Sequence, residues 1–150
     1  MTERGFISEP DPDNPGWLTW RLIDDTRFNG QVMGKMIVRS EGDGRARVRM
    51  FPEHKHTNLK GNLHGGTTLS FIDVAMFAGS RMFGLIEAGT AVTVDMSVQF
   101  IGGGKPDIPL DCEVELLKET GRLLFLRGLV VQEENRIAGW SGTIRKPSVR

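Results

Sequence analysis

Asp73 is the residue of this sequence whose position most needs a chemical explanation. It lies within a segment, Thr67 to Ala78, that is apolar along almost its whole length, and it is the only acid there before Glu87. Burying an isolated charge among apolar neighbours costs several kcal/mol or more. The carboxylate must therefore find a partner, stay protonated or do chemistry, and a carboxylate so placed can serve as a general base or a nucleophile.

Two glycines, Gly65 and Gly66, stand where the chain turns into the predicted helix. The backbone N–H groups of a first helical turn have no partner within the helix, and the positive end of the helix dipole lies there. Such a turn suits an oxyanion, because a residue without a Cβ lets it approach closely. Asp73 follows roughly 10–14 Å further along the axis. One substrate carbonyl cannot reach both groups of one chain, so the spacing predicts a site shared across a homodimer.

The residues Asn58, His64-Gly65-Gly66 and Asp73 resemble the motif of the hotdog-fold acyl-CoA thioesterases of the PaaI-like group, which includes phenylacetyl-CoA and 4-hydroxybenzoyl-CoA thioesterases. The segment from Ala91 to Val98 resembles the strand that follows the helix in that family. The resemblance covers residues 31–146. The Asn, His-Gly-Gly and Asp spacing is its specific part, whereas the strands are generic.

This resemblance implies hydrolysis of an acyl-CoA thioester to a carboxylic acid and coenzyme A, with no metal and no organic cofactor. Asp73 would act as base or nucleophile, the Gly65 N–H would polarise the carbonyl, and Thr93 would lie near the attacking water. Three further residues would shape the site: Asn58, His64 and Gly66.

Coenzyme A brings phosphates, so basic residues are candidate substrate contacts. We expect these among Lys105, Arg122 and Arg145. Lys105 ends the run 102–105, Gly-Gly-Gly-Lys, which is similar to a phosphate-binding loop. Pro106 stands where such a loop has Ser or Thr, so a flexible turn between strands is the simpler interpretation.

Two other functions remain open on the same fold. One is a non-catalytic acyl-CoA binder, a sensor or carrier, which would bind the ligand without turning it over. The other is an enoyl thioester hydratase. That chemistry usually pairs a catalytic His with an acid a few residues on, and His64 has no acid between itself and Asp73.

Other reactive side chains carry weaker signals. His54 and His56 could begin a metal site, but no third or fourth ligand is evident, so we predict solvated loop histidines and no metal. Cys112 stands between Asp111 and Glu113, whose carboxylates raise a thiol pKa, so a nucleophilic role is not expected.

The composition is that of a soluble globular domain. The 150 residues carry a formal net charge of +0, with 39% hydrophobic and 25% charged residues. These values favour neither nucleic-acid nor membrane binding. A single cysteine and the absence of a signal-like N-terminus predict a cytoplasmic protein.

The pattern of alternating apolar residues predicts an α+β fold. One long helix, from Gly66 to near Gly84, lies among six strand segments: 31–38, 44–51, 91–101, 110–118, 123–132 and 136–145. With one helix available, an antiparallel sheet wrapped round that helix is the natural solution, which is the hotdog arrangement. Its free face and edges favour a homodimer, and we expect a homotetramer.

The sequence divides at about residue 30. Residues 31–150 form the predicted hotdog domain, and residues 1–30 form an arm and entry segment that is rich in proline up to Pro15. Trp17 and Trp20 need a surface to lie on. We expect a short strand or turn that caps the core, with the wall of a neighbouring subunit's acyl pocket as the alternative.

Overall fold

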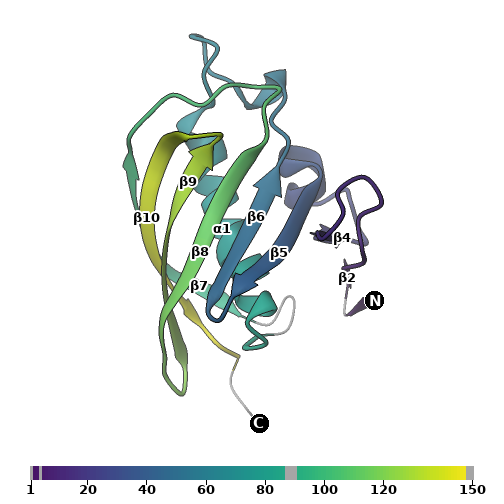
Figure 1. Ribbon diagram of the computed structural model, residues 1–150, viewed down its shortest axis with the longest axis vertical. Coiled ribbons are helices and arrows are strands. Elements are labelled where there is room, and N and C mark those ends of the chain that lie inside the picture. The colour runs from purple at the N-terminus through teal and green to yellow at the C-terminus, as the bar shows by residue number, and fades with distance from the viewer. Residues whose placement is uncertain (1, 4, 87–90, 148–150) are drawn as a thin grey trace.

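Seven strands form one antiparallel sheet, which curves round a single long helix (Figure 1). The structure is a computed structural model and describes residues 2–3, 5–86 and 91–147. Across the sheet the order is β3-β5-β6-β8-β9-β10-β7. The strands are β3 Leu18–Thr19, β5 Met36–Gly42, β6 Arg45–Met50, β7 Val92–Phe100, β8 Leu110–Glu119, β9 Leu123–Gln132 and β10 Asn135–Arg145. The predicted antiparallel sheet round one helix is confirmed.

The helix α1, Gly65–Met82, packs its apolar face into the concave side of the sheet. Phe71, Ile72 and Met76 are fully buried there. At Gly79 a Cβ atom would lie 2.9 Å from Val114 of β8, so a glycine is required for this close approach of helix and sheet. Gly84 follows the helix with φ of 74°, the left-handed conformation that ends helices, as the sequence predicted.

The first strand of the main domain begins later than predicted. The sequence indicated a strand from Gln31, but residues Asn29–Met33 form a π-helical turn, η1, and β5 starts at Met36. Gly34, with φ of 73°, ends the turn, and its N–H bonds to the Asn29 carbonyl. The five remaining strands lie within two residues of their predicted bounds.

The proline-rich arm is fastened to the main domain by polar and cation–π contacts. Asp11 is buried and bonds to Asn14 at 2.9 Å and to the Lys35 ammonium at 2.9 Å. Trp17 lies under the guanidinium of Arg39, 4.5 Å from it to the ring centre. The segment after it, β3, pairs with β5 and adds the seventh strand.

Trp20 is 2% exposed and belongs to the core of its own chain. It contacts Phe6, with ring centres 4.8 Å apart. The expectation of a segment capping the core is therefore confirmed for Trp20, whereas Trp17 is buried against the guanidinium groups of Arg39 and Arg49, outside the core cluster. The rest of the arm forms a small separate sheet of three short strands: β1 Thr2–Glu3, β2 Phe6–Ile7 and β4 Arg21–Leu22.

The strand β7 is the long edge strand of the large sheet, opposite the short edge strand β3. Among the described residues it pairs with β10 alone, and most of its side chains are exposed. Val94 and Phe100 are each 55% exposed, which leaves apolar surface along the edge. An unpaired apolar edge of this length is the kind of surface that natural proteins cover with another chain.

Within the described residues, none of the helices combines the length and the apolar character that a membrane crossing requires.

Candidate active site

The N-terminal turn of α1 leaves one backbone donor free. His64 caps the helix, and its Nδ1 accepts the N–H of Gly66 at 2.8 Å. The N–H groups of Thr67 and Thr68 bond to the His64 carbonyl oxygen. Among the described residues no hydrogen bond takes up the Gly65 N–H. Gly65, rather than Gly66, is therefore the donor that an oxyanion could use.

His56 holds this turn in place through hydrogen bonds. It is buried, and its Nδ1 accepts the Glu53 N–H at 2.9 Å while Nε2 donates to the Val32 carbonyl oxygen. Its own carbonyl oxygen accepts both the His64 N–H at 2.8 Å and the Thr67 hydroxyl at 3.1 Å. The prediction of a solvated loop histidine is wrong for His56, because its ring spans two distant segments.

The His54 and His56 pair cannot act together on a metal. His54 is exposed, whereas both ring nitrogens of His56 bond to the protein main chain. No cluster of three or more histidine, cysteine or acidic side chains suited to a metal occurs in the part of the chain that the structure describes.

Asp73 lies half-buried on the face of α1 that the sheet leaves uncovered. Leu69 and Gly66, one and two turns before it, are exposed on the same face. The apolar neighbours of Asp73 in the sequence suggested a buried carboxylate, and within one chain it is only half-buried. The Thr93 hydroxyl donates a hydrogen bond of 2.7 Å to Oδ1 of Asp73. Two residues that the sequence singled out, twenty positions apart, thus meet at the molecular surface.

A β-bulge explains how Thr93 reaches Asp73. Along β7, Asp95 pairs with Thr143, but the next pair is Thr93 with Ile144, so Val94 is an extra residue. Simple alternation would put Thr93 on the face opposite to Phe100. The bulge shifts the alternation by one residue and turns the threonine toward the helix, on the same side as the buried Ile144.

Asn58 closes the loop before the helix. Its Oδ1 accepts the N–H groups of Lys60 and Asn62, and its backbone N–H bonds to the Asn62 carbonyl oxygen. The Asn58 side chain is exposed, and its Nδ2 makes no hydrogen bond with the described residues. Among the described residues no hydrogen bond joins Asn58 to Gly65 or Asp73.

The glycine run 102–104, for which the sequence suggested a flexible turn, is hydrogen-bonded to its neighbours at both ends. Gln132 is buried, and its side chain accepts the Lys105 N–H and donates to the carbonyl oxygens of Lys105 and Ile108. The Gly104 carbonyl oxygen accepts the Leu63 N–H at 2.9 Å. The loop is therefore fastened to the segment that leads into the helix.

The three predicted substrate cations lie at two different ends of the molecule. Lys105 belongs to the end where α1 begins, and its Nζ is 2.6 Å from Asn62 Oδ1. Arg122 lies at the hairpin between β8 and β9, at the bottom of Figure 1. Arg145 is exposed at the end of β10, one residue after the buried Ile144, so it faces away from the helix.

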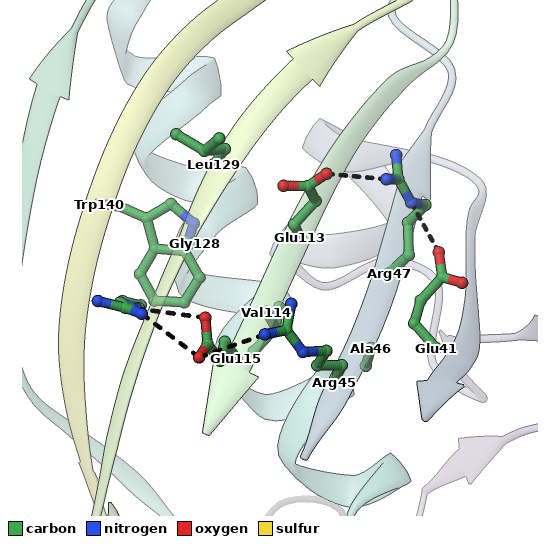
Figure 2. Close-up of a pocket in the computed structure, with 11 residues that line it drawn as sticks. Glu41, Arg45, Ala46, Arg47, Glu113, Val114, Glu115, Gly128, Leu129 and Trp140 are labelled. Carbon is green, nitrogen blue, oxygen red and sulfur yellow. Dashed lines mark hydrogen bonds and ion pairs between the residues drawn. The ribbon is translucent and has the colours of Figure 1, made fainter. Parts of the chain in front are cut away.

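The outer face of the sheet carries a separate cavity of about 600 Å³ (Figure 2). Its rim is charged, but the charges pair with one another: Arg47 bonds to Glu41 and Glu113, and Arg127 to Glu115. None of the residues that the sequence predicted for the site lines this cavity.

Cys112 is buried on the inner side of the same sheet. Burial is the main effect that raises the pKa of its thiol far above the usual range, and the carboxylates of Glu113 and Asp111 add to it. The sequence attributed the raised pKa to the carboxylates alone.

Comparison with known proteins places this geometry in a family. The model of the thioesterase superfamily matches residues 60–138, more than half of the chain. Human acyl-coenzyme A thioesterase 13 is 28% identical over 99 residues, which are 63% of this chain and 66% of the relative. The match thus spans just under two thirds of the length of this curated relative.

Solved structures share the backbone arrangement. The PaaI protein of the E. coli phenylacetic acid degradation operon superposes with a TM-score of 0.70, at 18% identity, over 83% of this chain and 87% of its own. A hypothetical thioesterase protein of Streptococcus pneumoniae, solved with coenzyme A, gives a TM-score of 0.66 at 19% identity, over 77% and 88%. The chain belongs to the thioesterase superfamily and has its hotdog fold.

Proposed function

We propose that this protein is an acyl-CoA thioesterase, which hydrolyses a thioester to a carboxylic acid and free coenzyme A. The observation that carries the proposal is the Asp73 carboxylate, held by the Thr93 hydroxyl at 2.7 Å on an open helix face. Family membership, the name of the human relative and the coenzyme A of the pneumococcal neighbour support the choice of substrate.

The chemistry needs few groups, because a thiolate leaves readily. Water attacks the carbonyl carbon while Asp73 takes its proton, and the oxyanion forms against the Gly65 N–H. The C–S bond then breaks, and the thiolate carries away the electron pair and regains the proton. Attack by the carboxylate itself, through an anhydride that water cleaves, uses the same residues. Thr93 orients the carboxylate in either route, and Oδ2 is left for water or substrate.

The two reacting groups come from different subunits in this proposal. α1 is continuous from Gly65 to Met82, so Asp73 lies about 12 Å along the axis from Gly65 at 1.5 Å per residue. A carbonyl held by Gly65 of one chain is out of reach of that chain's Asp73. A second chain must supply the partner group.

The free edge of β7 offers the geometry for this. If two copies pair antiparallel along β7 about Ser97, the bulge at Val94 brings Thr93 opposite the partner's Phe100. The Phe100 ring lies 3.5 Å from where a Cβ of Gly65 would be. Pairing of the edges therefore carries Asp73 and Thr93 of one subunit to the partner's Gly65, and covers the exposed apolar side chains of both strands. Two such dimers would form the expected homotetramer.

Thiol release from a panel of acyl-CoAs tests the function. The panel runs from acetyl through octanoyl and palmitoyl to phenylacetyl and 4-hydroxybenzoyl, and the wild-type protein should release free thiol from at least one of them. Binding of an acyl-CoA without thiol release would contradict hydrolysis and favour a sensor or carrier. Loss of enoyl absorbance without free thiol would instead favour a hydratase.

A further inference from the structure

The loop that leads into α1 forms a pocket of its own, with a volume of about 870 Å³. Four of its lining residues are His54, Lys55, Lys60 and His64, and none of its lining residues is an acid. Resting on the proposed function, we propose that this loop pocket, together with Lys105 beside it, binds the phosphate groups of the coenzyme A moiety.

Lys60 supplies a charge that the protein leaves unused. No carboxylate pairs with its ammonium group among the described residues. Lys55, in the same pocket, is different, because its Nζ already contacts Glu53 at 3.7 Å and the Gln31 carbonyl oxygen at 3.1 Å. On the outer face of the sheet the guanidinium of Arg47 is likewise paired with carboxylates in salt bridges. An ammonium group with no internal partner is free to meet a ligand's charge.

Lys105 brings a second such charge to the same place. Its Nζ lies 2.6 Å from Oδ1 of Asn62, in the loop itself, and it has no carboxylate partner within the described residues. Its backbone is fixed, because the buried Gln132 accepts its N–H at 2.8 Å. The two loops that carry the charges are joined at Leu63 and Gly104. The ammonium groups of Lys60 and Lys105 therefore lie at the same end of the molecule, where a hydrogen bond joins their two loops.

The pocket also offers a neutral donor and an apolar wall. Because Nδ1 of His64 accepts the Gly66 N–H, the neutral ring carries its proton on Nε2, where it can donate to an anion. Leu59, fully exposed at the loop tip, lines the same pocket. The coenzyme A moiety carries phosphates beside a heterocyclic base. Cations suit the phosphates, and apolar surface suits the base.

The position of the pocket agrees with the direction of the substrate. His64 lines the pocket and adjoins Gly65, whose N–H is the proposed oxyanion donor, so the pocket opens beside the reacting carbonyl of the same subunit. Arg122 lies at the opposite end of this chain, at the β8–β9 hairpin (Figure 1). The geometry therefore assigns the phosphates to Lys60 and Lys105 in place of Arg122 and Arg145.

Two thioesters of the same acyl group test the proposal: the acyl-CoA and the acyl N-acetylcysteamine thioester, which lacks every phosphate. Lys60→Ala should raise KM for the acyl-CoA about 5- to 20-fold, the effect of one charge-assisted contact, and the double change with Lys105→Ala should raise it further. Turnover of the N-acetylcysteamine thioester should stay at the wild-type value. Lys118→Ala, which removes an exposed lysine of β8, is the matched control. It should leave the KM for the acyl-CoA and the KM for the N-acetylcysteamine thioester unchanged.

Binding of 3′,5′-ADP, measured by calorimetry, gives a readout that needs no turnover. The wild type should bind it, and the double variant should bind it at least about tenfold more weakly. An equal rise in KM for both thioesters, no rise for either, or displacement of 3′,5′-ADP by inorganic phosphate with equal affinity would overturn the proposal. A wild type that binds 3′,5′-ADP but releases no thiol from either thioester would refute the thioesterase and leave the phosphate site standing.

Discussion

Replacing Asp73 by Asn should lower kcat for acyl-CoA hydrolysis by about 100- to 10,000-fold, the contribution typical of a positioned general base. Asn has nearly the shape of Asp, and its carbonyl oxygen can still accept the Thr93 hydroxyl hydrogen bond. The fold should therefore survive, and so should binding of the substrate. What the variant loses is the ability to take a proton or to attack the carbonyl carbon.

Initial rates of thiol release and a urea unfolding curve, measured on the same preparation, check this prediction. The matched control is Asp43→Asn, the same change at an exposed turn between β5 and β6. The control should keep wild-type kcat. If Asp73→Asn kept kcat within about threefold of wild type, the carboxylate would not be the catalytic group.

Gly128→Ala should have the largest effect on stability, with a loss of at least about 3 kcal/mol in the free energy of unfolding. A Cβ at Gly128 would overlap the Glu113 carbonyl oxygen of the neighbouring strand and lie 2.8 Å from Nε1 of Trp140. Figure 2 shows Gly128 and Trp140 side by side. Neither obstacle can move easily, because one is main chain and the other is a ring that is 5% exposed.

The matched control lies on the adjacent strand. At Gly139 a Cβ would meet its nearest neighbours, side-chain atoms of Ile101 and Leu129, at 3.8 Å, an ordinary contact distance. Gly139→Ala should therefore change stability by less than about 1 kcal/mol. Urea unfolding followed by circular dichroism compares the two variants. Equal stability of the two would show that the strands at Gly128 can separate without cost.

The parts of the fold that depend on local pattern could be predicted from the sequence. The helix boundaries follow from the glycines at both ends, and the last four strands follow from their alternating apolar residues. Family resemblance placed Thr93 near the attacking water, but its hydrogen bond to Asp73 was not predicted. The cause of that contact could not be predicted either, because a bulge such as that at Val94 depends on the partner strand β10 and leaves no signal in β7 itself.

Contacts between distant segments account for the features that the sequence missed. Histidine is a common residue in exposed loops. The burial of His56 depends on the hydrogen bond of its ring to the Val32 carbonyl oxygen, 24 residues earlier. Gln132 ends an ordinary strand, and its role appears only when the loop at Lys105 folds over it. The helix face around Asp73 is apolar enough to suggest burial, yet one chain leaves it open. A local pattern cannot tell burial by the same chain from burial by a partner.

The most direct test of the shared active site is the activity of a mixed dimer. Co-expressed chains with different tags, one carrying Asp73→Asn and the other Gly65→Val, are isolated as the heterodimer by two successive affinity steps. Each homodimer should be nearly inactive. In the heterodimer one site holds both defects and the other has an intact Asp73 facing an intact Gly65, so thiol release should reach about half of the wild-type rate per dimer. A heterodimer as inactive as both parents would place Asp73 and Gly65 in the same chain's site and contradict the account.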